Sequence, residues 1–211
     1  PNEINNYYEL FLGGGSVLLA VLSLQKQNKI VIKNKIYAYD INSYLINVFR
    51  HIQNNKEELY EFIKLYTQEY NSIKQLGIFE FPEYDKLKKK DPKKLNNQEI
   101  KTLSDYKIMK KDMEKQYRNP NTIELAKTSK ESYYYWIRNK YNNIDKHTIE
   151  CSALFMFINK TCFRGMYREG PNGYNVPYGH YKKTPTIISE TDLNYISDLI
   201  KDVEFKHISF T

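Results

Sequence analysis

The fold of this chain is decided by the stretch Tyr7-Tyr8-Glu9-Leu10-Phe11-Leu12-Gly13-Gly14-Gly15-Ser16-Val17-Leu18-Leu19-Ala20-Val21-Leu22. Its first part, up to Leu12, is aromatic and aliphatic, which is typical of a buried strand. The three glycines that follow let the backbone turn sharply with positive φ and come close to a ligand. Ser16 can then begin a helix, and a helix that opens directly off a glycine turn favours an anion or a polar cofactor group at its N-terminus.

A second strand, Ile36 to Asn42, contains a carboxylate, Asp40, 25 residues after Gly15. A strand, a glycine turn, a helix and an acid at the end of the next strand form the layout that holds an adenosine ribose. A nicotinamide dinucleotide would prefer spaced glycines for its pyrophosphate, whereas here the glycines are contiguous. Glu9, just before the turn, would repel a pyrophosphate but suits the sulfonium and amino groups of S-adenosylmethionine, which is therefore the better fit.

Composition sets bounds on the protein class. With 211 residues the chain can form one good core and a small second lobe. Its net charge of +7 favours an acidic partner, although the high Tyr, Asn, Lys and Ile content is typical of AT-rich genomes and weakens that inference. Two cysteines and four histidines predict neither a disulfide framework nor a metal site. The sequence shows no membrane span or signal peptide, so we expect a cytoplasmic protein with no membrane partner.

The middle of the chain predicts helices that pack on the sheet or begin a second lobe. We expect Ser43 to cap a helix up to Asn54, and Asn55 with Glu58 to cap another that ends near Gly77. Residues 79–120 are lysine-rich and polar, and we interpret them as a surface loop leading to a helix over 102–117. The lysines could sit on DNA phosphates, but a solvated loop is the favoured reading.

Further along, Tyr134, Arg138 and Tyr141 share one helical face, for which we expect a structural role in packing on the core. Residues 159–183 then alternate aromatic and basic side chains around the turn Pro171-Asn172-Gly173, which predicts an exposed hairpin or long loop. Its chemistry suits DNA, because arginine can bind a guanine edge with two hydrogen bonds. Exposed aromatic rings can also wedge between base steps.

These motifs together resemble the Dam-type DNA adenine-N6 methyltransferases. The first motif of that family usually reads Glu-Pro-Phe-x-Gly-Gly-Gly-Ser/Ala-Val, and its second motif contains Asp-Ile-Asn. This chain matches the first motif from Glu9 to Val17, except that Leu10 replaces the proline, and it matches the second from Asp40 to Asn42. The resemblance implies a class I S-adenosylmethionine-dependent methyltransferase fold, an α/β Rossmann-like sheet with an inserted, mainly helical DNA-recognition lobe that carries a β-hairpin. The implied cofactor-binding residues are Glu9, Phe11, Gly13, Gly14, Gly15, Ser16, Asp40 and Ile41.

The match is densest in residues 159–183, and it implies a hairpin in the major groove of double-stranded DNA that reads a short palindrome, GATC in the best-known members. Phe163 then resembles the wedge, Arg168 the guanine reader and Pro177 a contact to a thymine methyl group. Arg164 replaces an asparagine and Met166 a leucine of the family pattern, which weakens the case for GATC. The expected DNA-binding residues are Phe163, Arg164, Met166, Arg168, Asn175, Pro177, Tyr181 and Lys182.

No catalytic residue is identified, because the family's Asp-Pro-Pro-Tyr is expected beyond Thr211 and its leading motif before Pro1. We therefore expect no turnover from this chain alone. The expected organisation is residues 1–55 in the cofactor-binding core, 56–185 in the recognition lobe, and 186–211 returning to the core. In that last part we expect Ser189 to cap a helix and residues 203–210 to form a strand. Two alternatives stay open, a catalytically incomplete DNA-binding subunit that needs a partner and an RNA methyltransferase. The sequence leaves the oligomeric state open, and also whether the role is restriction–modification, marking or viral.

Overall fold

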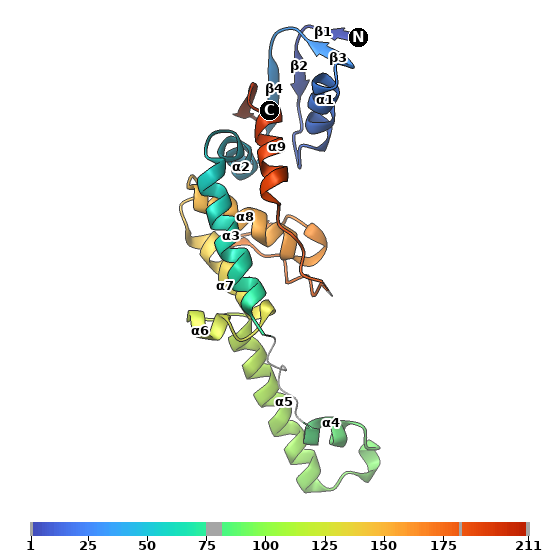
Figure 1. Ribbon diagram of the computed structural model, residues 1–211. Coiled ribbons are helices and arrows are strands. Elements are labelled where there is room, and N and C mark those ends of the chain that lie inside the picture. The colour runs from blue at the N-terminus through green and yellow to red at the C-terminus, as the bar shows by residue number, and fades with distance from the viewer. Residues whose placement is uncertain (1, 75–81, 182, 210–211) are drawn as a thin grey trace.

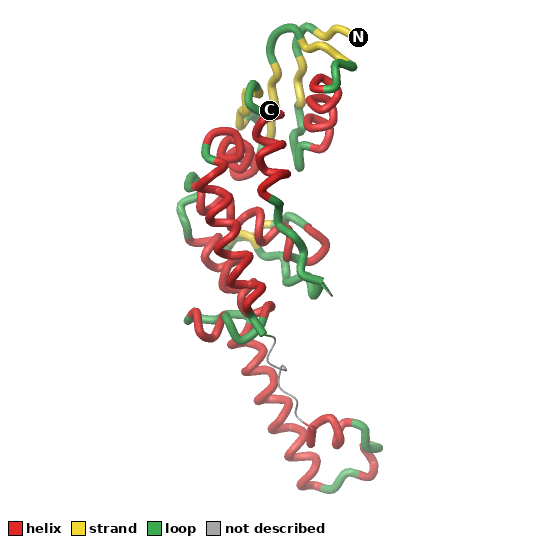
Figure 2. Tube along the Cα trace, viewed as in Figure 1, coloured by secondary structure: helices red, strands yellow, loops and turns green. Residues whose placement is uncertain are grey.

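The computed structural model describes residues 2–74, 82–181 and 183–209. The molecule is elongated, with the strands near both chain termini at one end, a helical middle, and a helical projection at the other end (Figure 1). Figure 2 shows that helix dominates the middle and the projection, whereas most of the strands gather at the terminal end. The strand content thus lies where the sequence predicted the cofactor-binding core.

The principal sheet is three-stranded and entirely parallel, with the order β2-β4-β7. Its strands are β2 (Tyr7–Glu9), β4 (Ile36–Asp40) and β7 (Val203–His207). A second parallel pair joins β1 (Asn2–Ile4) to β3 (Ile30–Ile32). The predicted first strand is therefore shorter than expected, because the chain leaves β2 after Glu9 to begin the glycine bend. Of the predicted last strand, Phe210 lies outside the described residues.

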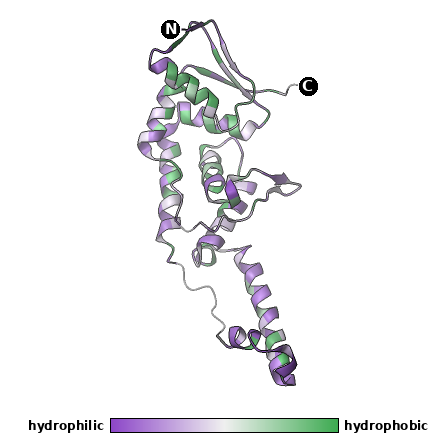
Figure 3. Cartoon of the chain, turned by 90° about the vertical axis from the view of Figure 1, so that its right-hand side faces the viewer, coloured by the Kyte–Doolittle hydropathy of each residue, from purple (hydrophilic) through white to green (hydrophobic). Residues whose placement is uncertain are grey.

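Helices cover one face of the principal sheet. Ile36, Ala38, Val203 and Phe205 are buried on that face, where α2 (Ser43–Asn54) packs on β4 and β7. Helices α1 (Ser16–Lys26) and α9 (Glu190–Leu199) complete the layer and contact each other. Figure 3 shows these helices along one side of the strands.

The opposite face of the sheet carries aromatic and charged side chains. Tyr8 is 52% exposed and stacks on Tyr37, with 5.1 Å between ring centroids. Tyr37 in turn stacks on Tyr39 at 6.1 Å and has the Lys206 ammonium 5.0 Å from its centroid. No helix of the described ranges packs over these tyrosines.

The helical middle is built on α8 (Ile149–Thr161), which is buried along most of its length between α2, α3 (Lys56–Ser72) and α7 (Lys130–Asn143). Tyr70, Tyr133 and Phe157 pack their rings edge-on or tilted in this core. The short α6 (Ile123–Ala126) leads into α7. None of the helices within the described ranges is long and apolar enough to cross a membrane.

Two of the predicted helix caps were wrong. Asn42, not Ser43, caps α2, because its side-chain oxygen accepts from the amides of Tyr44 and Leu45. Asn55 precedes α3 but makes no side-chain cap. The Ser189 cap of α9 is confirmed, since its hydroxyl accepts from the Asp192 amide at 3.0 Å. The predicted helix end near Gly77 lies outside the described residues, and α3 itself ends at Ser72.

The lysine-rich segment is more helical than predicted. It forms α4 (Pro82–Lys88), the short 3-10 helix η1 (Pro92–Lys94) and α5 (Asn97–Tyr117). Helix α5 starts five residues before the expected position because Asn96 and Glu99 form a reciprocal capping box. The surface-loop interpretation therefore holds only for the short connections between these helices.

Candidate functional site

The glycine bend joins the end of β2 to the start of α1. The Leu12 amide donates to the Tyr39 carbonyl at 2.8 Å, which fixes the bend against β4. Gly13 and Gly15 have φ values of 49° and 74°, in the left-handed region that favours glycine. Gly15 also occupies the N-cap position of α1 without a side-chain cap, so the first-turn amides of the helix face the bend.

The three glycines serve different purposes. A Cβ on Gly15 would lie 2.7 Å from Cζ of Phe49, a buried ring that stacks on Phe205. A Cβ on Gly13 would meet only the Phe11 carbonyl oxygen, at 4.0 Å. A Cβ on Gly14 would have no neighbour within 4 Å. Packing therefore requires glycine at position 15, whereas position 14 is open space beside the bend.

Asp40 lies at the bend, as the sequence predicted. Its Oδ2 accepts from the Gly13 amide at 2.8 Å, and its Oδ1 accepts from the Asn42 amide at the same distance. An ionised carboxylate offers about four acceptor positions, so each oxygen of Asp40 retains one. Two remaining acceptors on one rigidly held carboxylate match the two neighbouring hydroxyl groups of a ribose.

Exposed apolar side chains follow the ends of the parallel strands, close to Asp40 along the backbone. Phe11 is 75% exposed, Ile41 68% and Ile208 39%. The Ile208 amide donates to the Asp40 carbonyl at 3.2 Å, and Nε2 of His207 is 2.9 Å from the Ile41 carbonyl oxygen. The sequence reasoning missed Ile208 and His207, although it predicted their strand. A general rule could have found them: neighbouring parallel strands end at the same edge of a sheet, and ligands of open α/β sheets bind at that edge.

The two remaining predicted cofactor residues lie on either side of the bend. Glu9 ends β2 and accepts a hydrogen bond from the Tyr7 hydroxyl at 2.6 Å. Burial and this carboxylate raise the pKa of Tyr7, so the phenol stays a donor to Glu9. Ser16 is exposed and begins α1.

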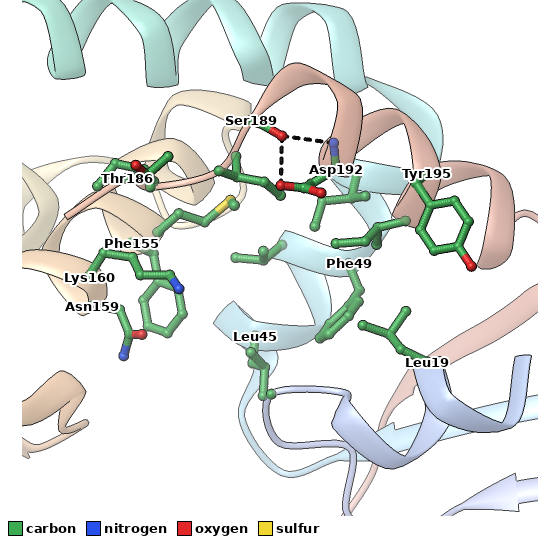
Figure 4. A pocket seen from close by; sticks show the side chains of 17 residues that line it. Leu19, Leu45, Phe49, Phe155, Asn159, Lys160, Thr186, Ser189, Asp192 and Tyr195 are labelled. Atoms are coloured by element: carbon green, nitrogen blue, oxygen red, sulfur yellow. Dashed lines mark hydrogen bonds between the residues drawn. The ribbon is translucent and has the colours of Figure 1, made fainter. Parts of the chain in front are cut away.

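A cavity of about 600 Å³ adjoins the bend through Gly14 (Figure 4). Its walls are mostly apolar and come from α1, α2, α8, α9 and the segment before α9. Asn159 and Lys160 lie at one side, and Asp192 and Tyr195 at the other. Neither Asp40 nor Phe11 lines it, so the cavity and the strand-end site are neighbours that meet at the bend.

The segment after α8 alternates buried and exposed side chains. Its elements are η2 (Phe163–Gly165) and the antiparallel pair β5 (Glu169–Gly170) and β6 (Gly173–Tyr174). Tyr174, Val176 and Tyr178 are buried, so the expectation of a segment outside the core was wrong for these residues. The predicted DNA-binding residues that the structure describes are all exposed: Phe163, Arg164, Met166, Arg168, Asn175, Pro177 and Tyr181. Lys182 lies outside the described residues.

Helix α7 holds this segment in place. Tyr134 and Arg138 both donate to the Val176 carbonyl, at 2.8 and 3.0 Å. One turn further on, Asn142 donates to the Tyr174 carbonyl at 3.0 Å and accepts from the Tyr174 amide at 2.9 Å. The predicted structural role of this helix face is thus borne out for Tyr134 and Arg138, and Asn142 extends it.

Arg168 and Asn175 form a pair on the exposed side. Nε of Arg168 donates to Oδ1 of Asn175 at 2.6 Å, and its Nη2 donates to the Asn175 carbonyl at 3.3 Å. A guanidinium has five N–H donors, so its outer end remains available. The pair therefore presents a pre-oriented guanidinium to the surface.

The described ranges contain no group of three or more His, Cys, Asp or Glu residues that could hold a metal ion. Burial raises the pKa of the Cys151 thiol to about 11, so this cysteine is protonated near neutral pH.

A parallel sheet covered by helices on one face, with a glycine bend and an aspartate at a strand end, places this chain in the α/β class of proteins. More specifically, the chain belongs to the family of D12 class N6 adenine-specific DNA methyltransferases, whose model matches residues 1–104 and 97–211. This family implies a class I S-adenosylmethionine-dependent methyltransferase fold, in agreement with the parallel sheet and with the resemblance seen in the sequence.

Three relatives show the extent of the similarity. The chain is 28% identical over 205 residues to the type II methyltransferase M.MjaIII of Methanocaldococcus jannaschii, covering 96% of this chain and 50% of that protein. It is 24% identical over 213 residues to M1.LlaDCHI of Lactococcus lactis subsp. cremoris, covering 99% and 50%. M.CviBI of Paramecium bursaria Chlorella virus NC1A is 42% identical over 55 residues, covering 25% and 21%. The chain thus spans about half the length of the first two relatives.

Proposed function

We propose that this chain forms the cofactor-binding and DNA-reading half of a site-specific methyltransferase, which transfers a methyl group from S-adenosylmethionine to adenine N6 in duplex DNA. The observation that carries the proposal is the contact between Asp40 and the Gly13 amide. That contact joins the two sequence motifs of the cofactor half in one place. Family membership supplies the reaction class.

The strand-end site fits S-adenosylmethionine. Asp40 would accept from the ribose hydroxyls with its two remaining acceptor positions. The exposed rings and branched chains of Phe11, Ile41 and Ile208 would lose contact with water against the adenine. Glu9 would place a negative charge near the amino and sulfonium groups of the cofactor. When bound, the cofactor supplies the methyl group, and this chain orients it.

The exposed side of residues 163–181 would read the DNA. Arg168 would bind a guanine edge while Asn175 holds its orientation, and Phe163 would wedge between base steps. Reading by a hairpin favours B-form DNA over RNA, because the A-form major groove is closed to side chains. We retain residues 1–55 and 186–211 as the cofactor end and 56–185 as the recognition lobe, with GATC as the hypothesis for the target.

The groups that would orient the adenine N6 are not among the residues assigned above, and the uncovered face of the sheet suggests where they come from. Entirely parallel sheets are almost always covered on both faces, and here Tyr8, Tyr37 and Tyr39 lie on a face without a helix layer in the described ranges. We propose that further methyltransferase sequence, corresponding to the unmatched half of the relatives, packs on this face and supplies the chemistry. A DNA-binding subunit that receives those groups from a partner fits the same observation. The names of the relatives, type II methyltransferases, favour a role in restriction–modification.

Equilibrium binding tests this proposal. We expect the chain to bind S-adenosylmethionine in calorimetry without competition from a nicotinamide dinucleotide. It should also bind a labelled GATC duplex more tightly than a GTAC duplex or a duplex RNA. Displacement of the cofactor by the dinucleotide, or equal affinity for the RNA, would count against the assigned function.

A further inference from the structure

Much of the charge of this protein is concentrated in residues 82–118, here called the arm. The arm contains eleven lysines and one arginine against seven aspartates and glutamates, a net charge of +5 out of +7 for the chain. It projects from the helical middle, away from the sheet (Figure 1). A segment with this charge attracts a polyanion.

The arm is an ordered structure and not a loose tail. Helices α4 and α5 pack on each other through the nearly buried Tyr84 and Leu87, and the Tyr106 hydroxyl donates to Glu83 at 3.0 Å. At its base, Nε of Arg118 lies 3.6 Å from Oε1 of Glu131 on α7. The arm therefore presents a fixed surface.

One face of α5 carries a lysine stripe, Lys107, Lys111 and Lys115. Residues four apart lie above one another on a helix, so the three ammonium groups point the same way. All three are exposed, and no ion pair engages them within the described ranges. By contrast, Lys90 pairs with Glu99 at 2.6 Å. The stripe is thus positive charge that the arm does not neutralise internally.

The length of α5 suits a nucleic-acid backbone. Its 21 residues span about 32 Å at 1.5 Å per residue. Duplex DNA rises 3.4 Å per base pair, so this length corresponds to roughly nine base pairs. No residue of α5 is buried, so the helix keeps exposed surface beyond its contacts with α4 and α7.

We propose that the arm is a second DNA contact, in which Lys107, Lys111 and Lys115 bind phosphates flanking the sequence that the hairpin reads. This inference rests on the proposed function. Phosphate contacts contribute affinity and register but no base preference, so the arm acts on every sequence equally. It enlarges the footprint without changing the target.

The test measures DNA affinity as a function of salt for the triple variant Lys107→Gln/Lys111→Gln/Lys115→Gln. Glutamine keeps the helix propensity close to that of lysine. Each lost phosphate contact lowers the slope of log K against log salt by about 0.9, so we expect a decrease of about 2.7. The ratio of affinities for GATC and GTAC duplexes should stay unchanged. The matched control, Lys29→Gln/Lys33→Gln/Lys201→Gln, removes equal charge near the sheet and should keep the slope.

A duplex shortened by about nine base pairs on the arm side should lower the salt dependence of binding to the wild-type chain by the same amount. If the wild-type chain binds DNA and the triple variant has the same slope, or if the control loses as much, the arm contact is overturned while the proposed function stands. If the stripe instead governs self-association in sedimentation, the arm is an interface between copies and the inference is wrong. A wild-type chain that binds no DNA would overturn both.

Discussion

The glycine bend yields a graded prediction, since the same substitution has a different consequence at each position. Gly15→Ala places a Cβ 2.7 Å from Phe49 at a φ of 74°. The left-handed conformation costs a non-glycine residue about 1–2 kcal/mol, and displacing a packed ring costs about 1–3 kcal/mol. Because Phe49 can shift in part, we expect the free energy of unfolding to fall by about 2–4 kcal/mol.

The matched control is Gly14→Ala, which meets no atom within 4 Å and has no positive φ. It should change the free energy of unfolding by less than about 0.5 kcal/mol. Gly13→Ala, with a φ of 49° and one contact at 4.0 Å, should lie between them at about 1 kcal/mol.

Urea unfolding without ligand measures the series, and calorimetry with S-adenosylmethionine completes it. If the cofactor lies against the bend, Gly14→Ala should weaken its binding while leaving stability intact. Equal stability losses at positions 14 and 15 would refute the packing argument. A Gly14→Ala variant with wild-type cofactor affinity would refute the position proposed for the cofactor.

Three further predictions concern the recognition segment and the core. Arg168→Ala should cost about 1–3 kcal/mol at one base pair in a binding-site selection, whereas a uniform loss across sequences would mark a phosphate contact instead. Asn142→Ala should lower the free energy of unfolding by about 1–3 kcal/mol and weaken DNA binding, because the Tyr174 backbone loses two hydrogen-bond partners. An equal loss of S-adenosylmethionine binding would argue against a cofactor site that is separate from the DNA-reading segment. Burial lowers the pKa of His51, which Glu58 only partly offsets, so the unfolded chain takes up the proton more readily. The free energy of unfolding should therefore decline as the pH falls below about 6.5, and His51→Gln should flatten this decline. If the variant has the same dependence of stability on pH as the wild type, His51 is not its cause.

The sequence could predict what depends on local pattern. The strand, the bend and the proximity of Asp40 follow from residue order, because a helix connects two neighbouring parallel strands. The role of Tyr134 and Arg138 was likewise predictable from helical spacing.

What the sequence could not give depends on contacts between distant segments. Ile208 joins the site only because β7 pairs with β4, across more than 150 residues. Tyr174 and Val176 are buried because side chains of α7 donate hydrogen bonds to their backbone carbonyls, whereas the composition of the segment resembles that of an exposed loop. In the arm, the helix over 102–117 was predicted, but the polar, lysine-rich residues before it were interpreted as a loop although they form α4, η1 and the capped start of α5.

Cofactor affinity of Asp40→Ala tests the central claim most directly. Removing two charge-assisted hydrogen bonds of about 1.5 kcal/mol each should weaken S-adenosylmethionine binding roughly 100-fold in calorimetry. Duplex DNA affinity should remain at the wild-type value, since residues 163–181 are untouched. An Asp40→Ala chain that binds the cofactor as tightly as the wild type would show that the nucleoside does not lie at this edge of the sheet.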